Sequence, residues 1–202
     1  MLRSLLSTTT LMMLMTGSAA AQWSVGLEAG VDRVPRFAIP TDTETEGLRA
    51  RPSMTWPLSL RLERGGEGPR LALSASRVDA GLELDDGEFG VVVRPGFRIL
   101  TITPEASHRL ASLAGGGSLR AHLALPLERW SFPGLADDPR WRLSTAAGLA
   151  GEFPMTRSLS VRISGQLGRA FGNPLDDSEM SEEYQPTTMW RRSARVGVVW
   201  KR

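Results

Sequence analysis

The sequence predicts an all-β protein, an antiparallel up-and-down transmembrane β-barrel of eight strands, with ten strands as the alternative. Three observations support this fold class. The last segment alternates between apolar and polar residues and carries a tryptophan at each end. The first residues have the composition of a secretory signal, and the connections between alternating segments differ regularly in length.

The segment 190–200 is the clearest strand. Its even positions are mostly apolar and its odd positions mostly polar, as expected for a strand with one face toward lipid and the other toward a lumen. Trp190 and Trp200 stand at the ends of the apolar face, where a bilayer has its two interfaces. A soluble, half-buried strand also alternates, but it has no reason to place an aromatic residue at each end.

The N-terminal residues have the features of a cleaved secretory signal. Arg3 supplies a positive charge, residues 11–15 lie in an apolar core, and the alanines at 19–21 offer a small-residue cleavage site. The apolar run is well short of the about 20 residues that a spanning helix needs. We therefore expect residues 1–21 to be a signal peptide and residues 22–202 to form the outer-membrane β-barrel domain.

The composition narrows the possible functions. The rest of the chain has no stretch apolar enough for a transmembrane helix, and it has no cysteine for a disulfide or a lipid anchor. The net charge is +2, and Lys201 is the only lysine among many arginines. Because the arginines are scattered among carboxylates, the pattern lacks the basic patch that a nucleic-acid partner needs, and we expect no nucleic acid to bind.

Five further segments alternate regularly, and each is close to the about 9 to 11 residues that a tilted strand needs to cross the hydrocarbon. Their apolar faces are predicted to point outward. In chain order, the outward positions are Trp23, Val25, Leu27, Ala29 and Val31; Trp56, Leu58, Leu60 and Leu62; Leu119, Ala121, Leu123, Leu125 and Leu127; Trp141, Leu143, Thr145, Ala147, Leu149 and Phe153; and Leu159, Val161, Ile163 and Leu167. Pro57 lacks an N–H for the ladder and is expected near a strand end.

Two segments are less regular. The apolar residues change parity after Ala75 and continue with Val78 and Ala80, which predicts a bulge or a loop entry near Arg77. In the next segment, the predicted outward residues are Val91, Val93, Phe97 and Ile99, and the predicted inward residues are Arg94, Gly96 and Arg98.

The connections follow the rhythm of barrels that have short periplasmic turns and longer extracellular loops. The long links cover 35–51, 128–140 and 171–187, and the short ones cover 65–69 and 154–157. This rhythm predicts both termini on the periplasmic side. The link 104–117 is the exception, because it is long enough for a helical turn over 105–114. The predicted interface aromatics are Trp23, Phe153 and Trp200 at one interface, and Trp56, Trp141 and Trp190 at the other.

With its signal segment, its alternating strands and an aromatic residue near the C-terminus, the chain resembles the small eight-stranded outer-membrane β-barrels of the OmpA/OmpX type. The resemblance covers the mature chain and rests on this pattern. It implies a bacterial outer-membrane location, contacts with membrane lipid and lipopolysaccharide, and recognition of the final strand by the barrel-assembly machinery. Family members usually end on the aromatic residue, whereas Lys201 and Arg202 follow Trp200 here.

The predicted inward faces carry many charged residues. A lumen of eight strands is about wide enough for its own side chains, and buried charges need partners, so we expect a network of arginine and carboxylate groups that plugs the interior. The predicted network comprises Glu28, Asp32, Arg61, Glu63, Arg94, Arg98, Arg120, His122, Glu128, Arg142, Glu152, Arg162, Arg191 and Arg195. These features predict a structural or surface-interaction scaffold, whose long loops are the expected site for an extracellular ligand. We expect no cofactor.

Two alternative functions remain open. Arginines outnumber carboxylates among the predicted lumen residues, so a narrow, porin-like channel would prefer anions. The second alternative is a soluble, lipocalin-like periplasmic barrel with its apolar face turned inward around a lipophilic ligand. The two placements differ in parity, because only the membrane barrel puts Leu123 and Val196 outside and Arg120 inside.

We expect neither a catalytic nor a metal site. His122 is the only inward histidine, and a pair with Ser144 or Ser164 would resemble the barrel-type lipid A deacylases and acyltransferases, but no third, orienting group is evident. The acidic segment 176–184 has ligands for a divalent cation but lacks the spacing of a calcium loop, which favours a solvated loop. The glycines at 115–117 are expected to form a flexible turn, because no phosphate-loop motif follows them.

Overall fold

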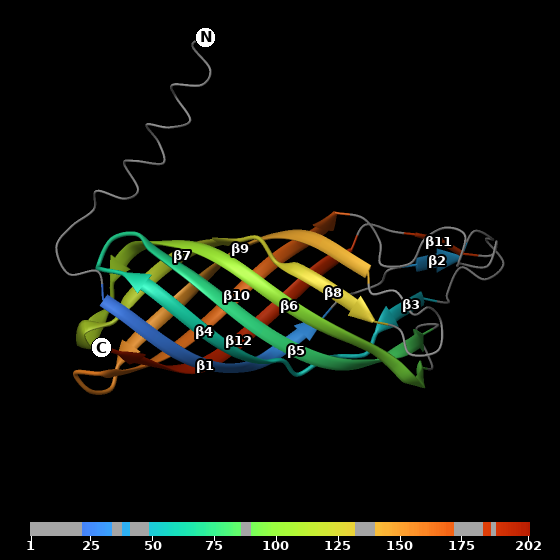
Figure 1. Cartoon of the computed structure of the whole chain (residues 1–202), viewed down its shortest axis with the longest axis horizontal. Helices are drawn as coiled ribbons and strands as arrows, with labels where there is room; N and C mark the ends of the chain where they lie inside the picture. Colours follow the sequence, from blue (N-terminus) through green and yellow to red (C-terminus); the bar gives the residue numbers. More distant parts are fainter. Residues whose placement is uncertain are drawn as a thin grey trace, which may run out of the picture.

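The computed structural model describes residues 22–33, 38–40, 49–85, 90–131, 140–171, 184–186 and 189–202. The predicted signal segment and almost all of the acidic segment 176–184 lie outside these ranges. In the described part of the chain, no helix is long and apolar enough to cross a membrane. The strands form an elongated cylinder (Figure 1).

Twelve strand segments in the described residues form one antiparallel sheet. They are β1 (Gln22–Arg33), β2 (Ala38–Pro40), β3 (Arg49–Pro52), β4 (Leu58–Gly65), β5 (Arg70–Asp85), β6 (Gly90–Ser112), β7 (Ser118–Ala124), β8 (Leu127–Ser131), β9 (Arg140–Pro154), β10 (Leu159–Phe171), β11 (Tyr184–Pro186) and β12 (Trp190–Lys201).

These segments make eight wall strands, as predicted. β3 and β4 both pair with β5, and β7 and β8 both pair with β6 and β9, so each of these two sets is one wall strand with a short interruption. Pro57 lies in the first interruption, next to the start of β4, as expected. β1 and β12 close the ring in a register that places Val25 opposite Trp200. The predicted fold class is therefore confirmed.

The two ends of the barrel differ in their connections. Gln22, Arg202 and the short links 66–69, 113–117 and 155–158 lie at one end, which we call the terminal end (left in Figure 1). The remaining links leave from the opposite end, which we call the loop end. The C-terminus is fixed in the wall, because the N–H of Arg202 donates to the Trp23 carbonyl at 3.0 Å.

The link 104–117 is mostly strand, so the expected helical turn over 105–114 is wrong. β6 continues to Ser112, and the link contains only a 3-10 turn in which Gly115 and Gly116 adopt positive φ angles of 71° and 80°. The ladder continues through Pro104, whose carbonyl accepts the N–H of Leu125 at 3.0 Å. Because the facing wall strand is interrupted between β7 and β8, it tolerates a proline that cannot donate.

A row of apolar side chains on three adjacent wall strands lines the interior near the loop end. Val78, Ile99 and Trp130 are register partners on β5, β6 and β8, and Ile99 and Trp130 are only 5% and 1% exposed. Arg98, next to Ile99, therefore points outward, where its side chain is 52% exposed and pairs with Asp79 at 3.0 Å. The predicted outward face for Ile99 and inward face for Arg98 are both wrong, because this part of the interior is apolar.

The irregularity of β5 lies at Gly81 and not near Arg77. β5 and β6 pair without interruption up to Ala80, and the register shifts before Leu82. Ser53 holds this site, since its N–H donates to the Gly81 carbonyl at 2.8 Å and its hydroxyl accepts the Gly81 N–H at 2.9 Å. The change of apolar parity after Ala75 therefore reflects the apolar row formed by Val78, Ile99 and Trp130 inside the barrel. The side chains of Val91, Val93, Arg94 and Phe97 lie outside the described residues.

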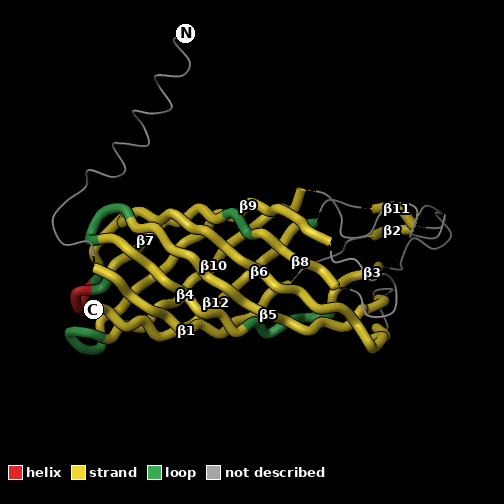
Figure 2. The backbone as a smooth tube through the Cα atoms, in the orientation of Figure 1, coloured by secondary structure: helices red, strands yellow, loops and turns green. Residues whose placement is uncertain are grey.

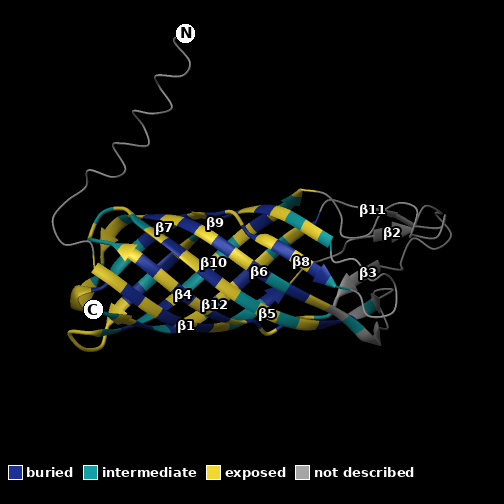
Figure 3. Ribbon diagram, in the orientation of Figure 1, coloured by how far each residue is buried: buried dark blue, intermediate teal, exposed yellow. Residues whose placement is uncertain are grey.

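The outer surface is apolar between two sets of aromatic residues. The strands cross the cylinder obliquely (Figure 2), and exposed and buried residues alternate along them (Figure 3). Leu123 and Val196 are exposed and Arg120 is buried, so the inverted parity of a soluble, lipocalin-like barrel is wrong. The predicted interface aromatics are all exposed: Trp23, Phe153 and Trp200 lie toward the terminal end, and Trp56, Trp141 and Trp190 lie toward the loop end, where Phe171 is exposed as well.

Candidate functional site in the barrel interior

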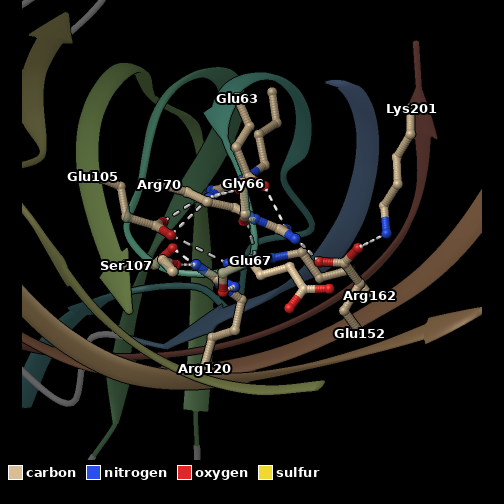
Figure 4. Close-up of polar contacts among 12 residues, drawn as sticks. Glu63, Gly66, Glu67, Arg70, Glu105, Ser107, Arg120, Glu152, Arg162 and Lys201 are labelled. Carbon is tan, nitrogen blue, oxygen red and sulfur yellow. Dashed lines mark hydrogen bonds and ion pairs between the residues drawn. The ribbon is translucent and has the colours of Figure 1, made fainter. Parts of the chain in front are cut away.

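The interior holds charged side chains in two groups, surrounded by buried serines and threonines. The first group, which we call the terminal-half cluster, lies in the half of the lumen near the terminal end, and Figure 4 shows polar contacts among its members. It consists of Glu28, Arg61, Glu63, Arg70, Glu105, Glu152, Arg162 and Lys201. These residues come from every wall strand except the one formed by β7 and β8, so the cluster ties most of the ring together.

Arg61 on β4 is held between two carboxylates. Its Nη1 and Nη2 donate to the two oxygens of Glu105 at 2.9 and 2.7 Å, and its Nε and Nη2 donate to Oε2 of Glu63 at 3.2 and 2.8 Å. All three side chains are buried. Only the planar, multiply donating guanidinium can make these four bonds, so a lysine here, with three donors on one nitrogen, would lose at least one of them.

Arg162 on β10 joins strands across the lumen. Its Nη2 lies 3.1 Å from Oε1 of Glu105, its Nε lies 3.3 Å from Oε1 of Glu28, and its Nη1 lies 3.9 Å from Oε2 of Glu63. β10 is a neighbour of β9 and β12 in the sheet, but not of β1, β4 or β6. These ion pairs therefore connect opposite parts of the wall.

Arg70 and Lys201 extend the cluster toward the terminal end. Nη1 of Arg70 lies 2.9 Å from Glu63 and 2.7 Å from Glu152, and Nζ of Lys201 pairs with the second oxygen of Glu152. Lys201 follows Trp200, so its inward position is what alternation requires at the end of β12. The residue that departs from the usual barrel ending thus serves the interior.

Arg120 on β7 anchors the turn between β4 and β5. Its side chain is fully buried, and its guanidinium donates to the carbonyls of Glu67, at 3.2 Å, and Gly68. Its Nε also donates to Oγ of Ser107 at 3.3 Å. Arg70 holds the same turn from its other side through the Gly66 carbonyl at 2.8 Å. The turn 66–69 is thereby fixed against the terminal mouth of the lumen (Figure 4).

The second group lies in the half of the lumen near the loop end, and its ion pairs are separate. Nη1 of Arg191 lies 2.5 Å from Oε1 of Glu128. Arg195 contacts Oγ of Ser59 at 3.1 Å and Oδ2 of Asp32 at 3.7 Å. A small cavity beside the first pair is also lined by Ser144, Gln166 and Ser193. This half of the lumen is therefore less densely connected than the terminal half.

The structure brings together some of the predicted lumen residues and separates others. The members that meet in the terminal-half cluster are Glu28, Arg61, Glu63, Glu152 and Arg162. Those that lie elsewhere in the interior are Asp32, Arg120, His122, Glu128, Arg191 and Arg195. Arg142 is half-buried and donates to the Trp141 carbonyl at 3.0 Å, whereas Arg98 lies outside.

The sequence analysis missed three members of the cluster. Glu105 lies in the predicted link 104–117, although Thr103, Glu105 and Ser107 continue the inward polar pattern. Arg70 was assigned to no face, because it directly follows the turn. Lys201 was treated as a tail beyond the last strand. In each case the alternation of the neighbouring residues gives the correct face.

His122 does not form the His/Ser pair that the sequence left open. It lies opposite Gly148, which in turn lies opposite Gln166, so neither Ser144 nor Ser164 is its direct cross-strand neighbour. Gly148 makes room for the ring, because a Cβ there would lie 2.6 Å from its Nε2. Among the described residues, Nδ1 of His122 has no hydrogen-bond partner. On its other side, the register partner of His122 is the buried Ser107 of β6, whose Oγ accepts a hydrogen bond from Nε of Arg120 at 3.3 Å.

Comparison with solved structures identifies the type of barrel. No protein family and no curated protein matches the sequence. The structure is similar to the outer membrane protein OprG of Pseudomonas aeruginosa, with a TM-score of 0.59 and 9% identity over 92% of this chain and 98% of that one. It is also similar to Neisserial surface protein A, with a TM-score of 0.54 and 10% identity over 88% of this chain and 96% of that one.

A third similar structure is the N-terminal β-barrel domain of Pseudomonas aeruginosa OprF, with a TM-score of 0.51 and 13% identity over 91% of this chain and all of that one. These matches confirm the predicted resemblance to small outer-membrane β-barrels. The fold and its apolar outer belt agree with the predicted location in the bacterial outer membrane. At these identities the similarity concerns the fold alone.

Proposed function

We propose that the protein is a closed outer-membrane barrel that acts as a membrane-embedded scaffold and not as a channel. The observation that carries this proposal is the set of ion pairs from Arg162 across the lumen to Glu28 and Glu105. Side chains that touch across a cylinder of eight strands occupy the path that a solute would take. The turn held by Arg120 narrows the same path at the terminal mouth.

The pairing of charge in the interior also supports a plug. Relative to the sequence pattern, the interior loses Arg98 and gains Glu105, Arg70 and Lys201. Each gained side chain forms an ion pair within the terminal-half cluster, so the added cations are neutralised by carboxylates. Anion preference in a narrow pore depends on an excess of positive charge, which paired cations do not supply.

A closed barrel leaves its ends and its outer wall for function. The links that follow β1, β8 and β10 leave from the loop end, which we assign to the cell exterior, and we propose that a surface partner binds there. We also propose that β12, with its exposed Trp200, is the strand that the barrel-assembly machinery reads. Both roles are compatible with a lumen that conducts nothing.

Planar-bilayer conductance of the refolded mature protein tests the closed interior. Heat-modifiable gel mobility first establishes that a barrel has formed. The proposal expects folded protein that inserts without conductance steps. Anion-selective steps that disappear when Arg162 or Arg195 is replaced would instead identify a channel, and a folded protein that does not enter lipid would contradict the membrane placement.

A matched pair of variants locates the plug. Arg61→Ser with Glu105→Ser removes one cation and one anion from the terminal-half cluster, whereas Arg191→Ser with Glu128→Ser removes the same charges from the loop half. We expect conductance steps in the first double variant and none in the second, because the first removes two members of a cluster with many ion pairs, whereas the second removes a single ion pair. Equal behaviour of the two would place the barrier elsewhere.

A further inference from the structure

The outer wall carries a group of arginines that a closed interior does not explain. Arg33, Arg169 and Arg192, which we call the arginine patch, lie on β1, β10 and β12 and are exposed on the outward face. Arg169 is the register partner of Trp190, and Arg192 follows Trp190 closely on the same strand. The patch therefore lies beside the aromatic set of the loop end.

Two members of the patch face each other directly. Arg33 and Arg192 are cross-strand partners in the antiparallel pair of β1 and β12. Cβ atoms at such positions lie about 4.5–5.5 Å apart, and like charges there are destabilising. In the described part of the chain, no carboxylate forms an ion pair with any of the three arginines. Arg98 is a useful contrast, since this outward arginine pairs with Asp79 at 3.0 Å.

The depth of the patch matches the level of lipid headgroups. The stretch of β12 between its two tryptophans covers about 33 Å of strand, or about 23 Å across a bilayer at a tilt of about 45°. This is close to the about 25 Å height of the apolar band of an outer-membrane barrel. Arg192 thus lies at the edge of that band, where its side chain can extend to the headgroups.

We propose that the arginine patch binds phosphate groups of an anionic glycolipid in the leaflet around the loop end. Guanidinium and phosphate form charge-assisted, bidentate hydrogen bonds, so one phosphate between Arg33 and Arg192 converts a repulsive pair into a bridged one. With the termini on the periplasmic side, this leaflet is the outer one, in which the lipid A part of lipopolysaccharide carries the phosphates. The inference rests on the proposed membrane placement and is independent of the closed interior.

Lipid A binding to the refolded full-length mature barrel in detergent micelles tests the site. Native mass spectrometry measures the affinity of bisphosphorylated lipid A and of the same lipid without phosphates. The test variant combines Arg33→Gln with Arg192→Gln, and the control is Arg64→Gln, which removes an outward arginine at the terminal end, where it stacks on Trp23. Heat-modifiable mobility verifies that each variant is folded.

We expect the affinity for bisphosphorylated lipid A to fall about tenfold or more in the double variant and to stay unchanged in the control. Removal of the phosphates should weaken binding to the wild type by a similar factor and have no further effect on the double variant. Equal affinities of wild type and double variant would overturn the proposal. Full competition by inorganic phosphate would also overturn the lipid assignment, since it would identify a site for soluble phosphate.

Discussion

The inward and outward faces of a single strand in this barrel are subject to different physical requirements. In β10, Arg162 points inward and contacts carboxylates from other strands, whereas the adjacent Ile163 points outward and is 54% exposed. An inward residue is specified by the side chains it meets, because a buried charge without a partner is costly. An outward residue is specified only by its depth in the lipid. Substitutions on the two faces should therefore fail for different reasons.

The largest effect is expected on the inward face, at Arg61. Arg61→Met leaves the buried Glu105 and Glu63 with fewer cations, and breaking such a site destabilises by about 3–5 kcal/mol. Urea unfolding in lipid vesicles measures the change in the free energy of unfolding. Arg61→Met combined with Glu105→Leu should recover part of the loss, because the uncompensated charge is then removed. A single variant as stable as the wild type would show that the cluster does not stabilise the fold.

On the outward face the comparable change is Ile163→Arg. Ile163 lies opposite Val196, midway between the two aromatic sets, and an arginine at the bilayer midplane costs about 2–4 kcal/mol. The control Leu159→Arg places the same charge beside Trp200, near the interface, where the cost is about 0–1 kcal/mol. The fraction folded after refolding into vesicles, read from heat-shifted gel bands, distinguishes the two. Equal yields would argue against this placement of the wall in lipid.

A smaller inward effect is expected in the loop half. Glu128→Gln weakens the pair with Arg191 and removes the charge from the group that accepts the Nε1–H of Trp130 at 2.9 Å, and we expect a loss of about 1–3 kcal/mol because no larger cluster of ion pairs is broken. The outward Arg129→Gln, next in the chain, should change stability little. Thermal unfolding followed by circular dichroism compares both with Arg61→Met. A loss as large as that of Arg61→Met would mean that the two halves of the lumen are equally connected.

The smallest effect is expected at the terminal-end interface. The guanidinium of Arg64 lies 5.4 Å from the centroid of the Trp23 ring, and an exposed cation–π contact contributes about 0.5–1 kcal/mol. Trp23→Leu should lose that amount beyond any change in apolar area. A double-mutant cycle with Arg64→Met isolates the contact, and a coupling energy near zero would assign the whole effect of Trp23 to lipid.

The sequence predicts the outward face well because lipid imposes the same requirement on every strand. The alternation of β1, β4, β7, β9, β10 and β12 follows the predicted parity, and the interface aromatics lie at the predicted ends. The interior is less predictable, because it can be polar or apolar as long as its residues suit one another. The apolar row of Val78, Ile99 and Trp130 is the clearest example, and it accounts for the error at Arg98.

The sequence also does not predict which inward side chains meet across the lumen. Alternation states that Arg162 and Glu28 both face inward, but it does not state that they meet, because their strands are separated by β12 in the sheet. That meeting depends on the stagger of all the strands around the ring. The error at Glu105 has a different origin. Glu105 lies in the predicted link 104–117, whereas β6 continues through Pro104, because the interrupted wall strand beside it accommodates the missing donor.

The hydrogen bonds from Arg120 to the turn between β4 and β5 affect the order in which the wall strands can assemble. The hairpin of β4 and β5 is local and closes at little entropic cost. Its turn, however, accepts hydrogen bonds from Arg120, which lies 53 residues after Glu67 and 52 residues after Gly68 in the sequence. Arg70 already holds the turn within the hairpin through the Gly66 carbonyl, but the bonds that tie the turn to the opposite wall form only after β7 has joined the sheet. We therefore expect the terminal mouth to be sealed only when the fifth wall strand arrives.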